Sequence, residues 1–491
     1  MIKKQTKITI ILALLALALG LLYFLVIAPM LNQSQDGEKE KYDKDGDLLD
    51  AVGSAYVFEP IERQNVAKIT VQNQNGTFTL KRDTLTDELV FEGAERLPYD
   101  QTKISALYVD TCNMTCIQKI ENAKQDLSIY GLDMSQNPAK ITVTAKDGAT
   151  HNVFVGQKLV TGGAYYVKNE QKPYIYAVGD SIEDTVLTDV NSFILPLLAK
   201  EIDANSYGYM DRFCLKKNGE IFIECEYIPD EQREQSGEIN IHRMTAPAKY
   251  IPSNDKYLEA LECFVSLVGE FVCEYNVSQK ENYNELMQSY GFDKPAYEIS
   301  YTFMGHDSLI LFGNKLNDSD AYCVYSPYTD IIATLSVEKV PFLRWSLMDF
   351  VSKEIFQRDI KRVNSITLSF DGEAHTYVLS GEEDNLLVTD NGKPVDTKNF
   401  RQLYIMLLGI RIQGFADSSV NTSSLPCVFT MQIVPDSNKT VEYKFYSLST
   451  GRLFYTIDGI GEFYVSREYI DFVIDGVKKL ASGKEVDSKL M

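Results

Sequence analysis

Ser253 and Lys256 are the residues whose types and spacing most resemble a catalytic motif. They form an S-x-x-K sequence at the start of a predicted helix, which places the serine hydroxyl and the lysine amine on one face. The S-D-N and K-T-G sequences that accompany this motif in penicillin-binding enzymes are absent, and the chain has no G-x-S-x-G sequence. Serine also favours the N-cap of a helix. We therefore predict a capping serine and no catalytic residues.

The eight cysteines contain no C-x-x-C pair. Disulfides are allowed outside the cytoplasm. However, Cys112 aligns with Leu408, and Cys323 with Tyr166, between the repeats described below. A cysteine in place of an apolar residue indicates a buried free thiol. We predict core thiols for the set, which is Cys112, Cys116, Cys214, Cys225, Cys263, Cys273, Cys323 and Cys427.

Cys214 and Cys225 are the one pair for which a disulfide stays open. They flank a turn at Asn218 and Gly219. A tight hairpin at this turn would place Cys214 opposite Ile223, so a disulfide requires a bulge.

The histidines and glycines predict neither a metal nor a cofactor site. No H-x-x-x-H spacing occurs. Residues 156–163 are rich in glycine but lack the Lys-Ser/Thr of a phosphate-binding loop, so they predict a turn before a strand. His151, His306 and His375 are predicted in or beside hairpin turns, and His242 in a loop.

Asp43, Asp45 and Asp47 superficially resemble a calcium loop. Gly46 comes two positions too early for the EF-hand pattern, and the twelfth position is Ser54 rather than Glu. We predict a solvated acidic linker here instead.

Four tyrosines could stack on a sugar ring, as in a carbohydrate-binding module: Tyr165, Tyr166, Tyr174 and Tyr176. Aromatic residues are also common in strands, where they pack against neighbours, and we favour this packing role. Because successive strand residues face opposite ways, either Tyr165 or Tyr166 could be exposed.

The run from Ile8 to Ala28 predicts a membrane anchor. Its 21 residues carry no charge and follow Lys3, Lys4 and Lys7, and about 20 apolar residues cross a bilayer as one helix. The lysines place the N-terminus in the cytoplasm, so we expect the remainder outside the cytoplasmic membrane. A cleaved signal peptide is the alternative, although its apolar core is usually shorter.

The charge of the chain excludes some partners. It has 48 basic and 69 acidic residues, a net charge of −21, and the part beyond the apolar run carries −24. Nucleic acids and anionic lipid surfaces require clustered Lys and Arg, so neither is expected as the main partner.

A hairpin pattern occurs three times in this outer part. Alternating apolar residues flank Asn75-Gly76, Asn218-Gly219 and Asp371-Gly372, which are typical hairpin turns. An amphipathic helix is predicted after each, and Asp100 and Asp396 are candidate N-caps. A strand meander then completes each unit.

The sequence therefore predicts an α+β protein with an N-terminal transmembrane helix and three tandem repeats, each an antiparallel sheet packed with a helix. The predicted segments are 1–29 (cytoplasmic tip and membrane helix), 30–56 (acidic linker), 57–200, 201–350 and 351–481 (the repeats, the second degenerate) and 482–491 (tail). Short helices are predicted at 182–187 and 193–198.

The phrases of the first repeat resemble the bacterial family called domain of unknown function 4340. They are residues 68–71, Tyr130-Gly131-Leu132-Asp133, Val155-Gly156 and residues 162–167. This resemblance implies a single-pass membrane protein with an outward α+β region, in a setting similar to auxiliary subunits of gliding-motility-type ABC transporters. It implies no reaction.

These observations predict a non-enzymatic extracytoplasmic accessory or binding protein, with an ABC transporter subunit or cell-envelope component as its partner. The alternatives are a cell-wall-acting hydrolase, whose carboxylate pair no spacing identifies, and a carbohydrate-binding protein. No binding residues can be assigned from the sequence.

Overall fold

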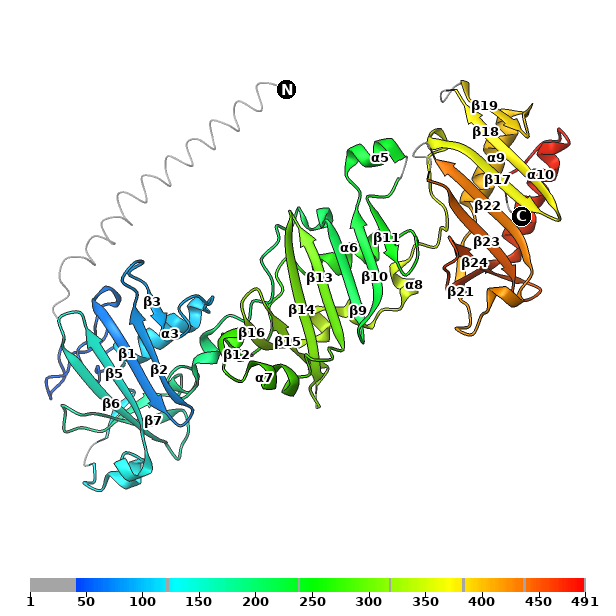
Figure 1. Ribbon diagram of the computed structural model, residues 1–491. Coiled ribbons are helices and arrows are strands. Elements are labelled where there is room, and N and C mark those ends of the chain that lie inside the picture. Colours follow the sequence, from blue (N-terminus) through cyan, green and yellow to red (C-terminus); the bar gives the residue numbers. More distant parts are fainter. Residues whose placement is uncertain are drawn as a thin grey trace, which may run out of the picture. The chain divides into compact units, whose positions relative to one another are not determined.

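The computed structural model describes residues 41–120, 123–236, 239–317, 319–381, 385–435 and 439–489. These residues form an α+β protein with three antiparallel sheets (Figure 1). The chain divides into two compact units, Met1–Phe193 with the first sheet and Ile194–Met491 with the other two. The predicted membrane helix lies outside the described residues, and none of the helices within them is long and apolar enough to cross a bilayer.

The first sheet has eight strands in the order β3-β2-β1-β5-β6-β7-β8-β4. Helix α3 (Gln101–Cys112) connects β3 at one edge to β4 at the other, and α4 (Ile182–Thr185) follows the last strand. The strands are β1 (Val66–Asn73), β2 (Gly76–Arg82), β3 (Leu89–Phe91), β4 (Gln118–Lys119), β5 (Ala139–Ala145), β6 (Thr150–Lys158), β7 (Ala164–Asn169) and β8 (Tyr176–Gly179).

The second sheet has the order β11-β10-β9-β13-β14-β15-β16-β12. Its helices are α5 (Asp230–Ser236), α6 (Asn254–Glu262), α7 (Tyr283–Ser289) and α8 (Leu347–Phe350). The strands are β9 (Arg212–Lys217), β10 (Glu220–Tyr227), β11 (His242–Ala246), β12 (Val272–Tyr275), β13 (Tyr297–Phe303), β14 (His306–Lys315), β15 (Ala321–Ser326) and β16 (Ile331–Ser336).

The third sheet has the order β20-β19-β18-β17-β22-β23-β24-β25-β21. Helix α9 (Thr397–Leu408) again leads to the far edge strand, and α10 (Arg467–Ala481) packs against α9. The strands are β17 (Val363–Phe370), β18 (Glu373–Ser380), β19 (Leu387–Asp390), β20 (Lys393–Pro394), β21 (Ile412–Phe415), β22 (Cys427–Pro435), β23 (Val441–Ser447), β24 (Arg452–Ile457) and β25 (Phe463–Ser466).

The three sheets share one topology. A hairpin and an edge strand come first, a helix then crosses to the opposite edge, and four more strands fill the sheet between them. Within the residues that the structure describes, the third sheet adds β20 at one edge. The predicted repeat of an antiparallel sheet with a helix is therefore confirmed, and the middle copy keeps every strand of the first.

The two outer helices begin as predicted. Asp100 accepts hydrogen bonds from the backbone N–H groups of Thr102 and Lys103, and Asp396 from that of Asn399. Cys112 is buried on α3, but its counterpart Leu408 is only half-buried, because the buried stripe of α9 includes Met406 instead.

Two predicted details of the turns and short helices are wrong. The first hairpin turns at residues 74 and 75, because Asn73 pairs with Gly76. Residues 194–198 are not helical: Leu197 bridges to Val268, and the Leu198 N–H donates to the Leu267 carbonyl. Pro196 in this segment has no N–H with which to continue a helix.

Residues 41–56 of the predicted acidic linker pack against the first sheet. Lys119, on edge strand β4, lies 2.5 Å from an Asp43 carboxylate oxygen and 3.3 Å from one of Asp45, and it also pairs with Asp47. Lys172 pairs with the other Asp47 oxygen at 2.5 Å. Asp47 is buried, so the three carboxylates that resembled a calcium loop surround a lysine ammonium group.

Tyr130 and Tyr290 each lie where the backbone passes close to a glycine in a strand of the same sheet. The Tyr130 carbonyl lies so close to Gly156 on β6 that an added Cβ would be 2.2 Å from its oxygen. Tyr290 and Gly313 on β14 repeat this contact at 2.0 Å. In both sheets the strand register shifts across this glycine, between Val155 and Lys158 in β6 and between Phe312 and Lys315 in β14. Tyr130 and Gly156, two of the residues that carry the family resemblance, are thus in backbone contact.

Candidate functional site

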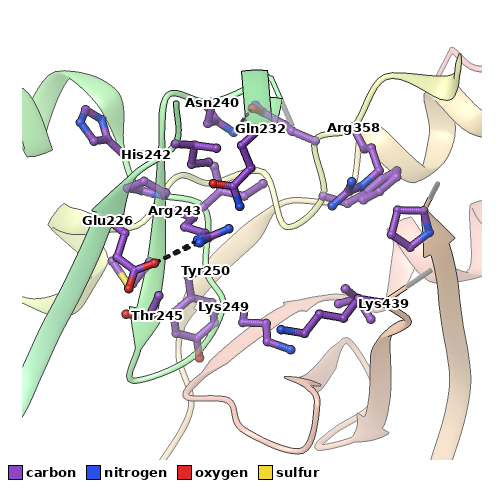
Figure 2. A pocket seen from close by; sticks show the side chains of 18 of the residues that line it. Glu226, Gln232, Asn240, His242, Arg243, Thr245, Lys249, Tyr250, Arg358 and Lys439 are labelled. Atoms are coloured by element: carbon purple, nitrogen blue, oxygen red, sulfur yellow. Dashed lines mark hydrogen bonds and ion pairs between the residues drawn. The ribbon is translucent and has the colours of Figure 1, made fainter. Parts of the chain in front are cut away.

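The second unit contains a groove of about 860 Å³ between the β10–β11 end of the second sheet and residues of the third (Figure 2). This volume lies within the usual range of ligand sites, roughly 300–1,000 Å³. Strands β10, β11, β22 and β23 contribute lining residues, together with α5 and the segments around Lys249 and Phe356. The groove is the candidate functional site.

Four cationic side chains line this groove, and Glu226 is the one carboxylate among its lining residues within the described part of the chain. Arg243 donates to Glu226 through Nε at 3.2 Å and Nη2 at 3.1 Å. Lys249 pairs with Asp458. The cations are Arg243, Lys249, Arg358 and Lys439, so the lining carries an excess of positive charge.

Lys249 and Lys439 extend toward one another across the groove (Figure 2). Burial, followed by the positive charge of Lys439, lowers the pKa of Lys249. Among the described residues no carboxylate is within ion-pair distance of Lys439. Asp458 already balances the charge of Lys249, whereas Lys439 adds a further positive charge to the same groove and would attract an anion.

Neutral hydrogen-bonding groups accompany the cations. Gln232 on α5, Asn240 and Thr245 line the same groove. The Asn240 amide donates to the Gln357 side chain at 3.1 Å, and the Thr245 hydroxyl donates to Glu224 at 3.0 Å. These groups can position the polar part of a ligand.

Tyr250 anchors the floor of the groove. Its hydroxyl accepts a hydrogen bond from the Glu462 N–H at 2.9 Å, and its ring packs edge-on against Phe463 with centroids 4.9 Å apart. Tyr250, Phe356 and Tyr443 are all buried, so these rings support the walls and offer no face for stacking a sugar.

Lys256 and Ser253 of the S-x-x-K sequence lie at the start of α6. Ser253 is the N-cap residue of α6, as predicted, although its side chain makes no capping hydrogen bond. Lys256 pairs with Glu259 at 2.7 Å and lies over the Trp345 ring at 4.5 Å from its centroid. These contacts give Lys256 a structural role.

The histidines occupy strands. His151 lies in β6 and stacks on Phe58. His306 begins β14, and Nδ1 of His375, in β18, lies 2.7 Å from an Asp390 carboxylate oxygen. His242 is not in a loop: it begins β11 and is buried, with Nε2 3.0 Å from the Gly208 carbonyl. Burial lowers the pKa of His242 to about 4 despite this hydrogen bond, so the ring is neutral at pH 7.

All eight cysteines are free thiols. Cys112, Cys116, Cys214, Cys225 and Cys323 are buried as predicted, Cys263 and Cys273 are half-buried, and Cys427 is exposed, which contradicts a core role for that residue. The second hairpin does contain a bulge. It sets Cys214 opposite Glu224 instead of Ile223, and Cys225 opposite Phe213.

The four candidate stacking tyrosines pack within the first unit. Tyr176 is buried, and Tyr165, Tyr166 and Tyr174 are half-buried, so none of the four is exposed. The Tyr165 hydroxyl donates to Glu183 at 2.8 Å, and Tyr166 packs edge-on against Tyr130.

The groove residues could not be recognised from the sequence. Its four cations are spread from residue 243 to residue 439 and show no local spacing. The one weak signal is that basic residues are a minority in so acidic a chain, although nothing in their order indicates that they converge.

Part of the chain matches a known protein family. Neither a curated protein nor a solved structure matches the chain. Residues 90–222, from β3 to β10, match the family described as Domain of unknown function (DUF4340), so that over this region the chain resembles that family.

Proposed function

We propose that this protein is a membrane-anchored, extracytoplasmic accessory protein that acts by binding, without catalysis, within an ABC-type transporter or another cell-envelope assembly. The observation that carries this proposal is the groove of the second unit. Fixed cations and neutral donors line it, a combination suited to holding a ligand.

Two further observations support the proposal. Tyr130 and Gly156 lie within residues 90–222, which match the DUF4340 family, and their contact is one of backbone packing. The uncharged run with lysines on its N-terminal side has the length and flanking charge of an inside-to-outside anchor.

The proposal can be tested by complementation of a deletion strain. The full-length chain and the Ser253→Ala/Lys256→Ala double variant should restore the wild-type phenotype equally. A chain without residues 1–29 should fail even when it is exported and folded, because the anchor supplies a high local concentration near a membrane partner. Loss of complementation by the folded double variant would favour an enzyme.

Topology needs a separate measurement. Protease added to intact protoplasts should degrade the part of the chain beyond Pro29. Complete protection, or recovery of a soluble form that begins near residue 29, would contradict the anchored arrangement.

A further inference from the structure

The charge of the groove is opposite to that of the protein around it. The chain carries a net charge of −21, yet four cations line this groove against two carboxylates, the lining Glu226 and Asp458, which pairs with Lys249. Concave sites lined by charge of one sign concentrate ions of the opposite sign. The groove is therefore a local anion trap on an acidic molecule.

The positions of the cations define what kind of anion fits. Lys249 lies in the segment after β11 and Lys439 in the segment before β23, and both point toward the same space, while Arg243 and Arg358 line the groove beside them (Figure 2). A lysine ammonium acts as a point charge, whereas an arginine can hold two oxygens at once. This set suits a compact group that carries more than one negative charge and several acceptor oxygens.

We propose that the groove binds the phosphate group of a small phosphorylated polar molecule. The phosphate lies between Lys249 and Lys439, and Gln232, Asn240 and Thr245 receive the hydroxyl-bearing body of the ligand. The inference rests on the proposed function, because it assigns a ligand class to the same groove.

Phosphate fits better than the other anions. A phosphate monoester carries a charge of about −1.5 to −2 at pH 7 and three acceptor oxygens, whereas a single carboxylate offers one charge and two oxygens. The part of the chain beyond the anchor carries a net charge of −24. This charge repels a long polyanion and opposes its binding. The buried rings of Tyr250 and Phe356 leave the polar groups to recognise the rest of the ligand.

The test is calorimetric titration of the detergent-solubilised full-length chain with glucose 6-phosphate and with inorganic pyrophosphate. Both should bind, and glucose and succinate should not. Lys439→Gln should weaken binding of both phosphates at least tenfold, since it removes one charge-assisted contact. Arg358→Gln should act in the same direction, and thermal melting should show that both variants remain folded.

Lys398→Gln is the matched control, because Lys398 is an exposed lysine on α9 that does not line the groove. Its affinity for both phosphates should equal that of the wild type. An equal loss in this variant would mean unspecific charge attraction and would overturn the proposal, as would binding of succinate as tight as that of glucose 6-phosphate.

Vesicles containing phosphatidylglycerol distinguish a soluble phosphate from a lipid headgroup. If the protein binds these vesicles but binds neither glucose 6-phosphate nor pyrophosphate, the proposal is rejected in favour of a membrane surface. The accessory function is judged separately: if Lys439→Gln loses phosphate binding but complements fully, the accessory function stands without this ligand. A further outcome is that complementation is lost only when the anchor is removed, while the wild-type protein binds no phosphate. That pair of results would contradict the phosphate inference and leave the accessory function in place.

Discussion

Single residues decide how the acidic segment 41–56 is held. Asp47 is buried and contacts Lys119, Lys172 and the Tyr176 hydroxyl, the last at 3.2 Å. Burial raises the pKa of the Asp47 carboxyl, but the hydrogen bonds and charges of the two lysines outweigh burial, and the net pKa is lowered. A carboxylate with a lowered pKa stabilises the folded state above its unfolded pKa, and this stabilisation is lost as the pH falls through the folded value.

Asp47→Asn should therefore destabilise the first unit by about 3 kcal/mol at pH 7, because it leaves part of a buried charge network without its partner. Chemical denaturation at pH 7 measures this. The difference from the wild type should shrink as the pH falls below about 4. Asp45→Asn is the control, since Asp45 makes a longer contact of 3.3 Å with Lys119; an equal loss in both variants would contradict the central position of Asp47.

His242 gives the second unit a pH dependence of its own. Its folded pKa of about 4 lies below its ordinary value of 6.5. Between these values the unfolded chain takes up a proton that the folded chain excludes. The free energy of unfolding should thus fall by about 2 to 3 kcal/mol from pH 7 to pH 4.5 through this residue.

In His242→Phe this component of the pH dependence should be missing, because the phenyl ring cannot titrate. Denaturation of the second unit at both pH values checks the difference. His306→Phe, at an exposed position at the start of β14, should retain the full pH dependence. A wild-type slope in the His242 variant would rule out this explanation.

At the scale of elements, the sequence predicts what short-range pattern determines. The hairpins β9–β10 and β17–β18, the N-caps Asp100 and Asp396, and the meanders follow from alternation, turn residues and helical spacing. The position of Lys119 against Asp43 and Asp47 could not be predicted, because it joins residues more than 70 positions apart. The groove could not be predicted for the same reason, since its cations meet only after two sheets have formed.

The glycines of the Tyr-Gly contact provide a prediction at this scale. Gly156→Ala and Gly313→Ala should each destabilise their unit by about 3 kcal/mol or more, because the new methyl group collides with a backbone carbonyl that a neighbouring segment fixes. Gly179→Ala and Gly451→Ala are the matched controls: Cβ would lie 3.9 Å from its nearest neighbour at Gly179 and in open space at Gly451. Equal stability of all four variants by denaturation would show that the strand can shift to accommodate the methyl group.

At the scale of the whole molecule, the chain forms two compact units, and the acidic segment belongs to the first. A fragment of residues 56–491 retains all the strands of the three sheets but lacks Asp43, Asp45 and Asp47. Lys119 and Lys172 then lose the carboxylates that they contact. The folded first unit therefore includes residues N-terminal to 56, at least as far as Asp43.

Fragments 41–491 and 56–491 should both be soluble, but they should differ in the unfolding of the first unit. We expect this transition to be about 3 kcal/mol less stable in the shorter fragment, as for a broken buried ion pair, whereas the transition of the second unit should be unchanged. Denaturation followed by limited proteolysis assigns each transition to a unit. Coincident curves for the two fragments would show that the segment adds no stability.

The same segment has a mechanical consequence. When the chain is pulled from its N-terminal side, residue 41 is the first of the described residues to bear tension, and the bridges Tyr42–Leu48 and Leu49–Ala55 are then loaded one after the other. Their release, together with rupture of the contacts of Lys119, would free residues 41–55 at about 3.4 Å per residue, or roughly 50 Å of extra reach. The segment would thus act as a force-sensitive extension that lengthens before any strand of the first sheet is lost.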